Sequence, residues 1–348
     1  MKTIDRDTFE SLIDDLIAED PRDVVGVVER DGQYVYDHLD SAADLELGYD
    51  CTMLSPKKYF MPQQETLLSY CANEDGSTEM TADPDTTGTV VVGVHPYDLV
   101  AIEQLDKIFV DTLRDEPYRR RRENSLLIGL TMQSASETCF AGSMGTATTD
   151  SGYDLMLTDL DDRFAVDIGT FEGDQLLDGV ATENASPEEI QRVREIEAAV
   201  DDLFERDLAV PPEELPTLLE ASYDDTDFWE SYAEQCLSCG TCNVVCPTCY
   251  CFNMEVERDL VGERGRETRR WDGCLLEDFA TVAQGENFRE ELAQRHRHRF
   301  MRKGWYIYER YGDIACVGCG RCTSQCVADV ADPCEVYNRL HEEVSVHV

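Results

Sequence analysis

Hydrophobic positions at the start of the chain change from helical to strand spacing within 40 residues. Between residues 3 and 19 the apolar side chains recur every three or four positions, at Phe9, Leu12, Ile13, Leu16 and Ile17, which predicts a surface helix. Residues 23–40 have the composition of two strands, with Asp31 and Gly32 between them. An Asp-Gly pair between apolar runs is typical of a tight hairpin turn, so this segment predicts a β-hairpin.

Further strands and helices alternate up to about residue 225. An apolar run at residues 90–94 predicts a strand, and helical spacing follows to residue 112; residues 126–130 and 164–168 predict strands, and residues 187–208 a long charged helix. Pro211-Pro212 indicates a linker, and helical stretches recur at 275–283 and 288–300. We therefore expect an α+β protein: an amino-terminal α/β domain (1–225) and a mainly helical, ferredoxin-like domain (226–348).

Charge narrows the possible partners and the compartment. The 348 residues carry 73 Asp and Glu against 30 Lys and Arg, a formal net charge of −43, which excludes binding of nucleic acid through bulk charge. Acid spread through the whole chain is typical of a halophilic protein solvated in high salt. Residues 1–18 do not resemble a signal peptide and no apolar run is long enough for a membrane span, so we expect a cytoplasmic protein.

Most of the 15 Cys lie after residue 235, and their spacing repeats. Cys236, Cys239, Cys242 and Cys246 are followed 80 residues later by Cys316, Cys319, Cys322 and Cys326. This is the spacing of two-cluster ferredoxins, in which three thiolates bind one 4Fe-4S cluster and the fourth binds the other. We assign Cys236, Cys239, Cys242 and Cys326 to cluster 1, and Cys316, Cys319, Cys322 and Cys246 to cluster 2.

Two features modify this interpretation without changing it. Zinc sites also use Cys pairs two residues apart, but a fourfold motif that occurs twice favours iron-sulfur clusters. Pro247 follows Cys246, whereas Val327 follows Cys326, which indicates a looser turn there. Two clusters that exchange their fourth ligands must lie close together, so the motifs predict an electron relay.

The remaining Cys leave a third cluster open. Cys139, Cys249, Cys251 and Cys274 supply four thiols, either as ligands of a third iron-sulfur cluster or as small buried side chains. Cys51, Cys71 and Cys334 are interpreted as structural. The loop at residues 142–146 matches no nucleotide-binding fingerprint, His95 is interpreted as a turn residue, and no catalytic triad or carboxylate pair is recognisable, so no catalytic residue is assigned.

Residues 252–310 stand out by their charge, because they contain 12 basic and 12 acidic side chains in an otherwise acidic protein. Two interpretations remain open: the basic residues offset anionic clusters or dock an acidic partner, or they form an ordinary salt-bridged surface. The residues concerned include Arg264, Arg266, Arg269, Arg270, Arg295, Arg297, Arg299, Arg302 and Lys303, with His296 and His298.

Several longer motifs resemble one family. The segments at 246–252 (Cys-Pro-Thr-Cys-Tyr-Cys-Phe), 271–274 (Trp-Asp-Gly-Cys), 285–289 and 316–322 are similar to those of the iron-sulfur beta subunit of soluble sulfhydrogenases, which are nickel-iron hydrogenases, and of the corresponding iron-sulfur subunit of anaerobic sulfite reductase. Shorter matches at 59–62, 93–98, 122–124, 138–140, 143–146 and 154–159 extend the resemblance over most of residues 55–326. Two positions depart from the family pattern: Ala141 and Tyr97 stand where the family often has Cys.

The resemblance implies a 4Fe-4S protein that relays electrons between a flavin-containing, NAD(P)H-reactive subunit and a catalytic subunit, either a hydrogenase or a sulfite reductase. Catalysis would then lie in another chain. An alternative is a protein that itself reduces sulfur or a disulfide at a third cluster. The sequence does not distinguish the hydrogenase partner from the sulfite reductase partner.

Overall fold

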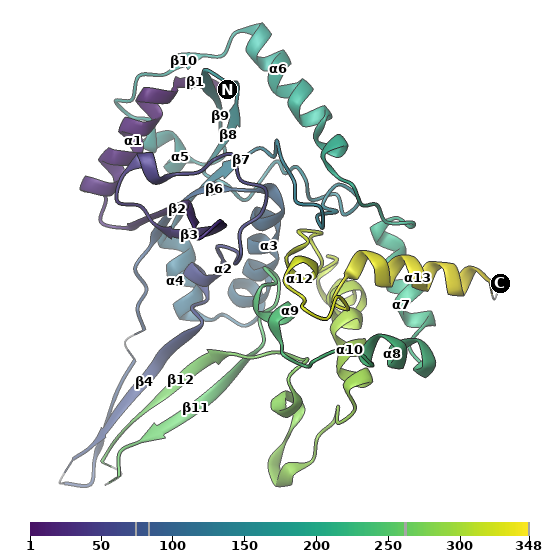
Figure 1. The fold of residues 1–348 in the computed structure, drawn as a ribbon. Coiled ribbons are helices and arrows are strands. Elements are labelled where there is room, and N and C mark those ends of the chain that lie inside the picture. Colours follow the sequence, from purple (N-terminus) through teal and green to yellow (C-terminus); the bar gives the residue numbers. More distant parts are fainter. Residues whose placement is uncertain (74, 83, 261–262, 347–348) are drawn as a thin grey trace.

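A computed structural model describes residues 1–348 except 74, 83, 261–262 and 347–348. The fold is α+β and is built around an eight-stranded sheet in the order β10-β1-β9-β8-β7-β6-β2-β3 (Figure 1). Its strands are β1 (Lys2–Asp5), β2 (Asp23–Arg30), β3 (Gln33–His38), β6 (Thr89–Val94), β7 (Leu126–Leu130), β8 (Leu155–Asp159), β9 (Arg163–Ile168) and β10 (Glu183–Asn184).

The centre of this sheet is parallel and fully buried. Strands β2, β6, β7 and β8 pair in parallel, and every residue of β6 and β7 is buried, which explains their unbroken apolar sequences. Parallel neighbours need crossover connections, and α3 (Pro96–Asp106) and α4 (Glu116–Asn124) lie in the crossover from β6 to β7. The predicted hairpin and the predicted strands at 126–130 and 164–168 are confirmed.

Helix α1 (Arg6–Glu19) confirms the first predicted helix and buries Phe9, Leu12, Ile13 and Leu16. The remaining helices of this part are α2 (Lys57–Phe60), α5 (Phe171–Leu176) and α6 (Pro187–Ala198). The prediction of one helix over residues 187–208 is wrong in its second half. Helix α6 ends at Ala198 and is followed by a short 3-10 turn and irregular chain.

A second sheet has the order β11-β12-β4-β5 and extends from the body of the molecule as an arm (Figure 1). Its strands are β4 (Gln64–Ala72), β5 (Thr78–Thr81), β11 (Phe252–Arg258) and β12 (Arg264–Trp271). The strands at 252–271 were not predicted from the sequence. Because β12 pairs with β4, the arm joins strands from both expected domains, and a division at residue 225 stays a prediction.

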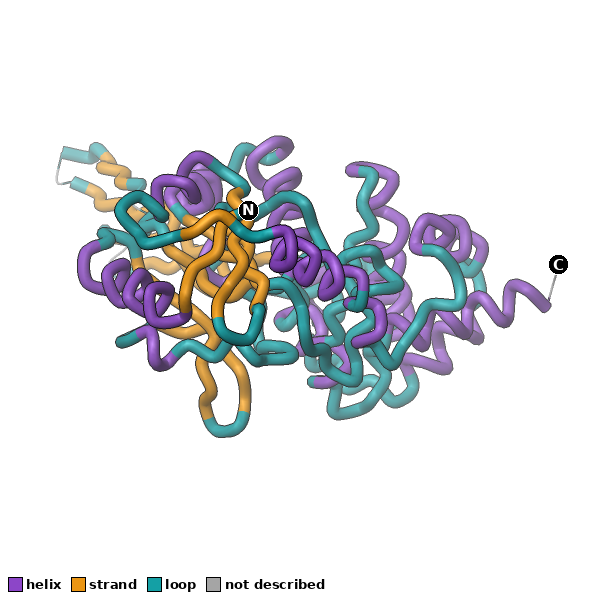
Figure 2. The backbone as a smooth tube through the Cα atoms, turned by 90° about the horizontal axis from the view of Figure 1, so that it is seen from above, coloured by secondary structure: helices purple, strands orange, loops and turns teal. Residues whose placement is uncertain are grey.

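The carboxy-terminal part is mainly helical and lies beside the large sheet (Figure 2). Its helices are α7 (Leu215–Ala221), α8 (Thr226–Ala233), α9 (Thr241–Val244), α10 (Leu292–Met301), α11 (Ile307–Tyr311), α12 (Arg321–Ser324) and α13 (Pro333–Val346). A π-helical turn, Arg302–Tyr306, directly continues α10. The predicted helix at 288–300 corresponds to α10, whereas residues 275–283 contain only a 3-10 turn at Glu277–Ala280, so that helix prediction is wrong.

No helix among the described residues is long and apolar enough to cross a membrane.

The charge of −43 predicts that stability depends strongly on salt. At about 1 M salt the screening length falls to about 3 Å, so repulsion between the surface carboxylates is largely removed. We expect the melting temperature to rise steadily between low salt and molar KCl, as measured by circular dichroism. A melting temperature that stays the same over that range would contradict a halophilic protein.

Candidate metal centres

The four thiols assigned to cluster 1 surround one cavity of about 370 Å3. Cys236, Cys239, Cys242 and Cys326 all line it, although 84 residues separate Cys242 from Cys326. Gly240 has a φ of +74°, which reverses the chain between Cys239 and Cys242 and lets α9 begin there. The structure therefore brings together the set that crosswise exchange of the fourth ligand predicts.

The four thiols assigned to cluster 2 also interact. A charge on Cys246 raises the pKa of Cys316, Cys319 and Cys322, so these three lie within its electrostatic reach. For each of the three, burial is the larger cause of the raised pKa, and Arg321 opposes it at Cys319 as Arg299 does at Cys322. The local backbone repeats the first motif, because Gly320 (φ +76°) precedes α12 as Gly240 precedes α9.

A loop of the amino-terminal part holds the second motif in place. Thr138 Oγ1 donates to Gly320 O (3.1 Å), and the Phe140 amide donates to Gly318 O (2.8 Å). Thr146 Oγ1 donates to Val317 O (2.7 Å). A Cβ added at Gly318 would lie 2.8 Å from the backbone of Ala141, so only glycine allows this approach. The small-residue loop at 142–146 is therefore part of the support of the second Cys motif.

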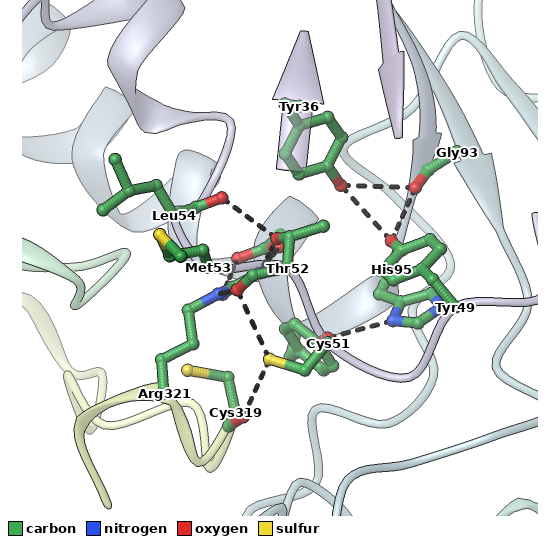
Figure 3. Close-up of polar contacts among 12 residues, drawn as sticks. Tyr36, Tyr49, Cys51, Thr52, Met53, Leu54, Gly93, His95, Cys319 and Arg321 are labelled. Carbon is green, nitrogen blue, oxygen red and sulfur yellow. Dashed lines mark hydrogen bonds and ion pairs between the residues drawn. The ribbon is translucent and has the colours of Figure 1, made fainter. Parts of the chain in front are cut away.

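Arg321 ties the same motif to the large sheet (Figure 3). Its side chain is fully buried and forms two hydrogen bonds to Asp98, with Nη1 to Oδ1 at 2.7 Å and Nη2 to Oδ2 at 2.6 Å. Nε donates to Thr52 O (2.8 Å), and Nη2 also donates to Thr52 Oγ1 (2.8 Å). Because Arg321 lies between Cys319 and Cys322, this ion pair positions the loop that carries them.

His95 supports this arrangement and has no catalytic geometry. Its ring stacks on Tyr49 at 4.0 Å between centroids, and its Nδ1 lies 3.0 Å from Tyr97 Oη. Burial lowers the pKa of His95 to about 3, so the ring is neutral. Tyr36 and Tyr49 both donate to Gly93 O, which fixes the turn before α3 (Figure 3).

Of the four Cys considered for a third cluster, the structure brings three together. Cys249, Cys251 and Cys274 line one cavity of about 320 Å3. Cys139 does not line it and packs instead with Tyr97, Met132, Val317 and Cys319. Among the described residues, no three Cys, His, Asp or Glu side chains converge as a single metal ion requires. The thiols surround cavities instead, which is the arrangement that a multi-iron cluster requires.

Two buried cations lie among these thiols without an ion-pair partner in the described part of the chain. Arg299 is 3% exposed, and its Nε and Nη1 have no hydrogen-bond partner. Burial opposes its charge, but the charges of Cys242, Cys322, Cys246 and Cys249 outweigh burial and raise its pKa. Lys303 is likewise enclosed, and Cys246 and Cys249 raise its pKa against the effect of burial. Unpaired buried cations require nearby negative charge, which thiolate-bound iron-sulfur clusters supply.

Lys57 is a third cation at this place, and nothing in the sequence patterns had singled it out. Its side chain is 2% exposed, and its Nζ donates to the carbonyl oxygens of Cys246 and Cys249, both at 2.8 Å. Burial lowers the pKa of Lys57 to about 8. The available signal was its position beside the family-like segment at 59–62, in a chain with only five Lys.

The basic residues of 252–310 therefore divide between the two interpretations. Arg266 and Arg270 form exposed ion pairs with Glu257 and Glu255 in the arm, as an ordinary surface would. Arg269 is buried in ion pairs with Glu65 and Asp115. Arg299, Arg302 and Lys303, by contrast, line the cavity of Cys249, Cys251 and Cys274, so only this part of the set offsets charge at the thiols.

The remaining Cys have separate surroundings. Cys71 lies on β4 in the arm and is partly exposed. Cys334 is buried at the start of α13, and its Sγ donates to Asp207 O (3.4 Å). Cys51 lies beside the second motif, with its Sγ 3.7 Å from Cys319 O.

Comparisons with known proteins agree with the Cys pattern. Residues 235–330 match the family model described as a 4Fe-4S dicluster domain. The chain is 31% identical to Sulfhydrogenase 2 subunit beta of Pyrococcus furiosus over 309 residues, which cover 88% of this chain and 89% of that protein. A shorter match, 33% over 48 residues, links 14% of this chain to 13% of the F420-dependent formate dehydrogenase subunit beta of Methanocaldococcus jannaschii. No solved structure matches the chain significantly.

Proposed function

Because the chain belongs to the family of sulfhydrogenase beta subunits, we propose that it is the iron-sulfur electron-transfer subunit of a multi-subunit oxidoreductase. Cluster 1 would be held by Cys236, Cys239, Cys242 and Cys326. Cluster 2 would be held by Cys316, Cys319, Cys322 and Cys246. When bound, a 4Fe-4S cluster supplies one-electron redox chemistry.

The observation that carries this proposal is the adjacency of the two Cys sets. Burial raises the pKa of Cys242, of cluster 1, to about 12, and a charge on Cys322, of cluster 2, contributes to the same shift. Arg299 responds to thiols of both sets. Two clusters that share one buried cation lie close enough to exchange electrons, and the protein encloses them in a low-dielectric core that limits reaction with solvent.

The relay would connect a flavin-containing subunit that reacts with NAD(P)H to a catalytic subunit. Of the two catalytic partners that the motifs allow, we favour a hydrogenase, because the relative with the longest match is named a sulfhydrogenase subunit. Neither of the two relatives bears the name of a sulfite reductase. The route into the relay would lie near Cys239, the one exposed Cys of the eight.

Replacing Cys316 with Ser in the assembled complex is expected to abolish electron transfer between the NAD(P)H-reactive and catalytic subunits. The replacement removes one thiolate of cluster 2 and interrupts the relay. NAD(P)H-dependent hydrogen turnover measures this step. Turnover of the catalytic subunit with an artificial electron donor should persist, because that donor bypasses the relay.

The matched control is Cys71→Ser, because Cys71 lies in the arm and lines neither of the two Cys cavities. Full NAD(P)H-dependent turnover is expected in this variant. Undiminished turnover in the Cys316→Ser complex would show that electrons do not pass through cluster 2, and the relay proposal would then fail.

A second candidate function is reduction of a sulfur compound or a disulfide by this chain itself. The observation that favours it is the separate cavity of Cys249, Cys251 and Cys274, which neither ferredoxin motif uses. Turnover by the isolated chain with an artificial donor, lost in Cys274→Ser, would support this function over a pure relay.

A further inference from the structure

The thiols of Cys249, Cys251 and Cys274 form a set of their own. They come from the turn after Pro247 and from the segment after β12, and they line a common cavity. That cavity, about 320 Å3, is nearly as large as the cavity of about 370 Å3 between the cluster 1 thiols. A group that fits between the cluster 1 thiols therefore also fits here.

A buried amide donates to two of these sulfurs. Asn243 is 3% exposed, and its Nδ2 donates to Cys274 Sγ (3.5 Å) and to Cys249 Sγ (3.8 Å). Its Oδ1 accepts from the Leu275 amide (3.2 Å), which fixes the orientation of the amide group. Sulfurs that accept N–H donors are stabilised as thiolates, and such bonds tune clusters bound through them.

Positive charge surrounds the same cavity. Arg299, Arg302 and Lys303 all line it, and no acidic side chain is among its lining residues. Arg302 lies over the ring of Tyr250, 4.7 Å from its centroid, and Lys303 Nζ donates to Thr248 Oγ1 (2.6 Å). Together with the two unpartnered nitrogens of Arg299, this arrangement calls for an anionic group in the cavity.

Three thiolates leave the fourth position of a cube without a protein thiolate. Cys139, the fourth thiol that the sequence suggested, packs in another cluster of side chains. Cys246, which contacts Cys249, belongs to cluster 2 under the proposed function. One iron of a cube in this cavity would therefore be open to an external ligand, and the surrounding cations favour a small anion.

We infer that Cys249, Cys251 and Cys274 bind a third 4Fe-4S cluster, whose fourth iron takes a small external anion. This inference rests on the proposed function, since it assigns Cys246 to cluster 2.

The test is iron and acid-labile sulfide per chain after anaerobic reconstitution of the full-length protein in high salt. Three cubes give about twelve iron atoms per chain in the wild type, and Cys274→Ser should reduce this to about eight. Cys139→Ser is the matched control, because Cys139 is buried but outside the cavity, and should keep about twelve. Cys251→Ser provides a second ligand variant in case Cys274→Ser does not fold.

Cyanide, a small anion, probes the open position after excess sulfide has been removed. It should change one part of the reduced EPR spectrum in the wild type and leave the Cys274→Ser spectrum unchanged. A wild-type spectrum that cyanide does not alter would overturn the open iron position.

About eight iron atoms in the wild type would overturn the third cluster and leave the relay intact. The same conclusion would follow if both Cys274→Ser and Cys251→Ser kept the wild-type iron content, or if Cys139→Ser lost iron to the same extent. A wild type that binds no iron after reconstitution would instead overturn the proposed function itself, so the two failures are distinguishable.

Discussion

Replacing Asp98 with Ala is expected to lower the free energy of unfolding by about 3–5 kcal/mol, since removing one partner of a buried ion pair leaves the other charge uncompensated. Both side chains of the Arg321–Asp98 pair are fully buried, and Asp98 accepts two hydrogen bonds from the guanidinium. Denaturant unfolding monitored by circular dichroism measures the loss. The iron content should fall as well, because Arg321 positions the loop between Cys319 and Cys322.

Two further variants separate this ion pair from nonspecific damage. The double variant Asp98→Leu with Arg321→Met removes both charges and should recover part of the lost stability. Glu116→Ala removes an exposed partner of Arg119 and should change stability far less. If Asp98→Ala were no less stable than Glu116→Ala, Arg321 would not depend on Asp98, and the positioning role would be wrong.

Removing the iron-sulfur clusters is expected to destabilise the helical part by several kcal/mol, because each buried, uncompensated ion carries a penalty of that size. Arg299 and Lys303 are both buried among the Cys, and neither has an ion-pair partner in the described part of the chain. Hydrogen exchange before and after anaerobic chelation of iron measures the effect. Protection should be lost first around α10 and the π turn, and much less in β6 and β7.

The control for this prediction is Arg299→Met, in which one of the two cations is absent. The difference in stability between the cluster-loaded and cluster-free forms should be smaller in this variant than in the wild type. Equal hydrogen-exchange protection in loaded and cluster-free wild-type protein would contradict the view that the clusters compensate these charges.

The sequence predicted well those features whose determinants lie close together in the chain. The hairpin of β2 and β3 follows from the Asp31-Gly32 turn between apolar runs, and β7 from five consecutive apolar or small residues. The arm was missed because β11 and β12 are largely exposed and rich in charge. They therefore lack the apolar alternation that identifies a half-buried strand, and β12 owes part of its pairing to β4, about 200 residues earlier.

The candidate centres divide in the same way. Spacing alone pointed to the eight ferredoxin-type Cys, because three thiols two residues apart are a local property of the chain. It gave no means of deciding on Cys139, since an isolated thiol has no spacing rule, and the fold places it beside Val317 rather than Cys274. Asn243 and Lys57 were also missed, because their contacts with the Cys segments depend on chain positions up to about 190 residues apart.

By itself, then, the sequence determined the kind of chemistry: thiolate ligands in two ferredoxin repeats, in an acidic α+β chain. The tertiary structure decided what surrounds those thiols, with Asp98 and Thr52 holding Arg321, and Arg299 and Lys303 buried among the Cys. The physical reason is that ligand spacing is set along the backbone, whereas burial and charge compensation arise only when distant segments pack together.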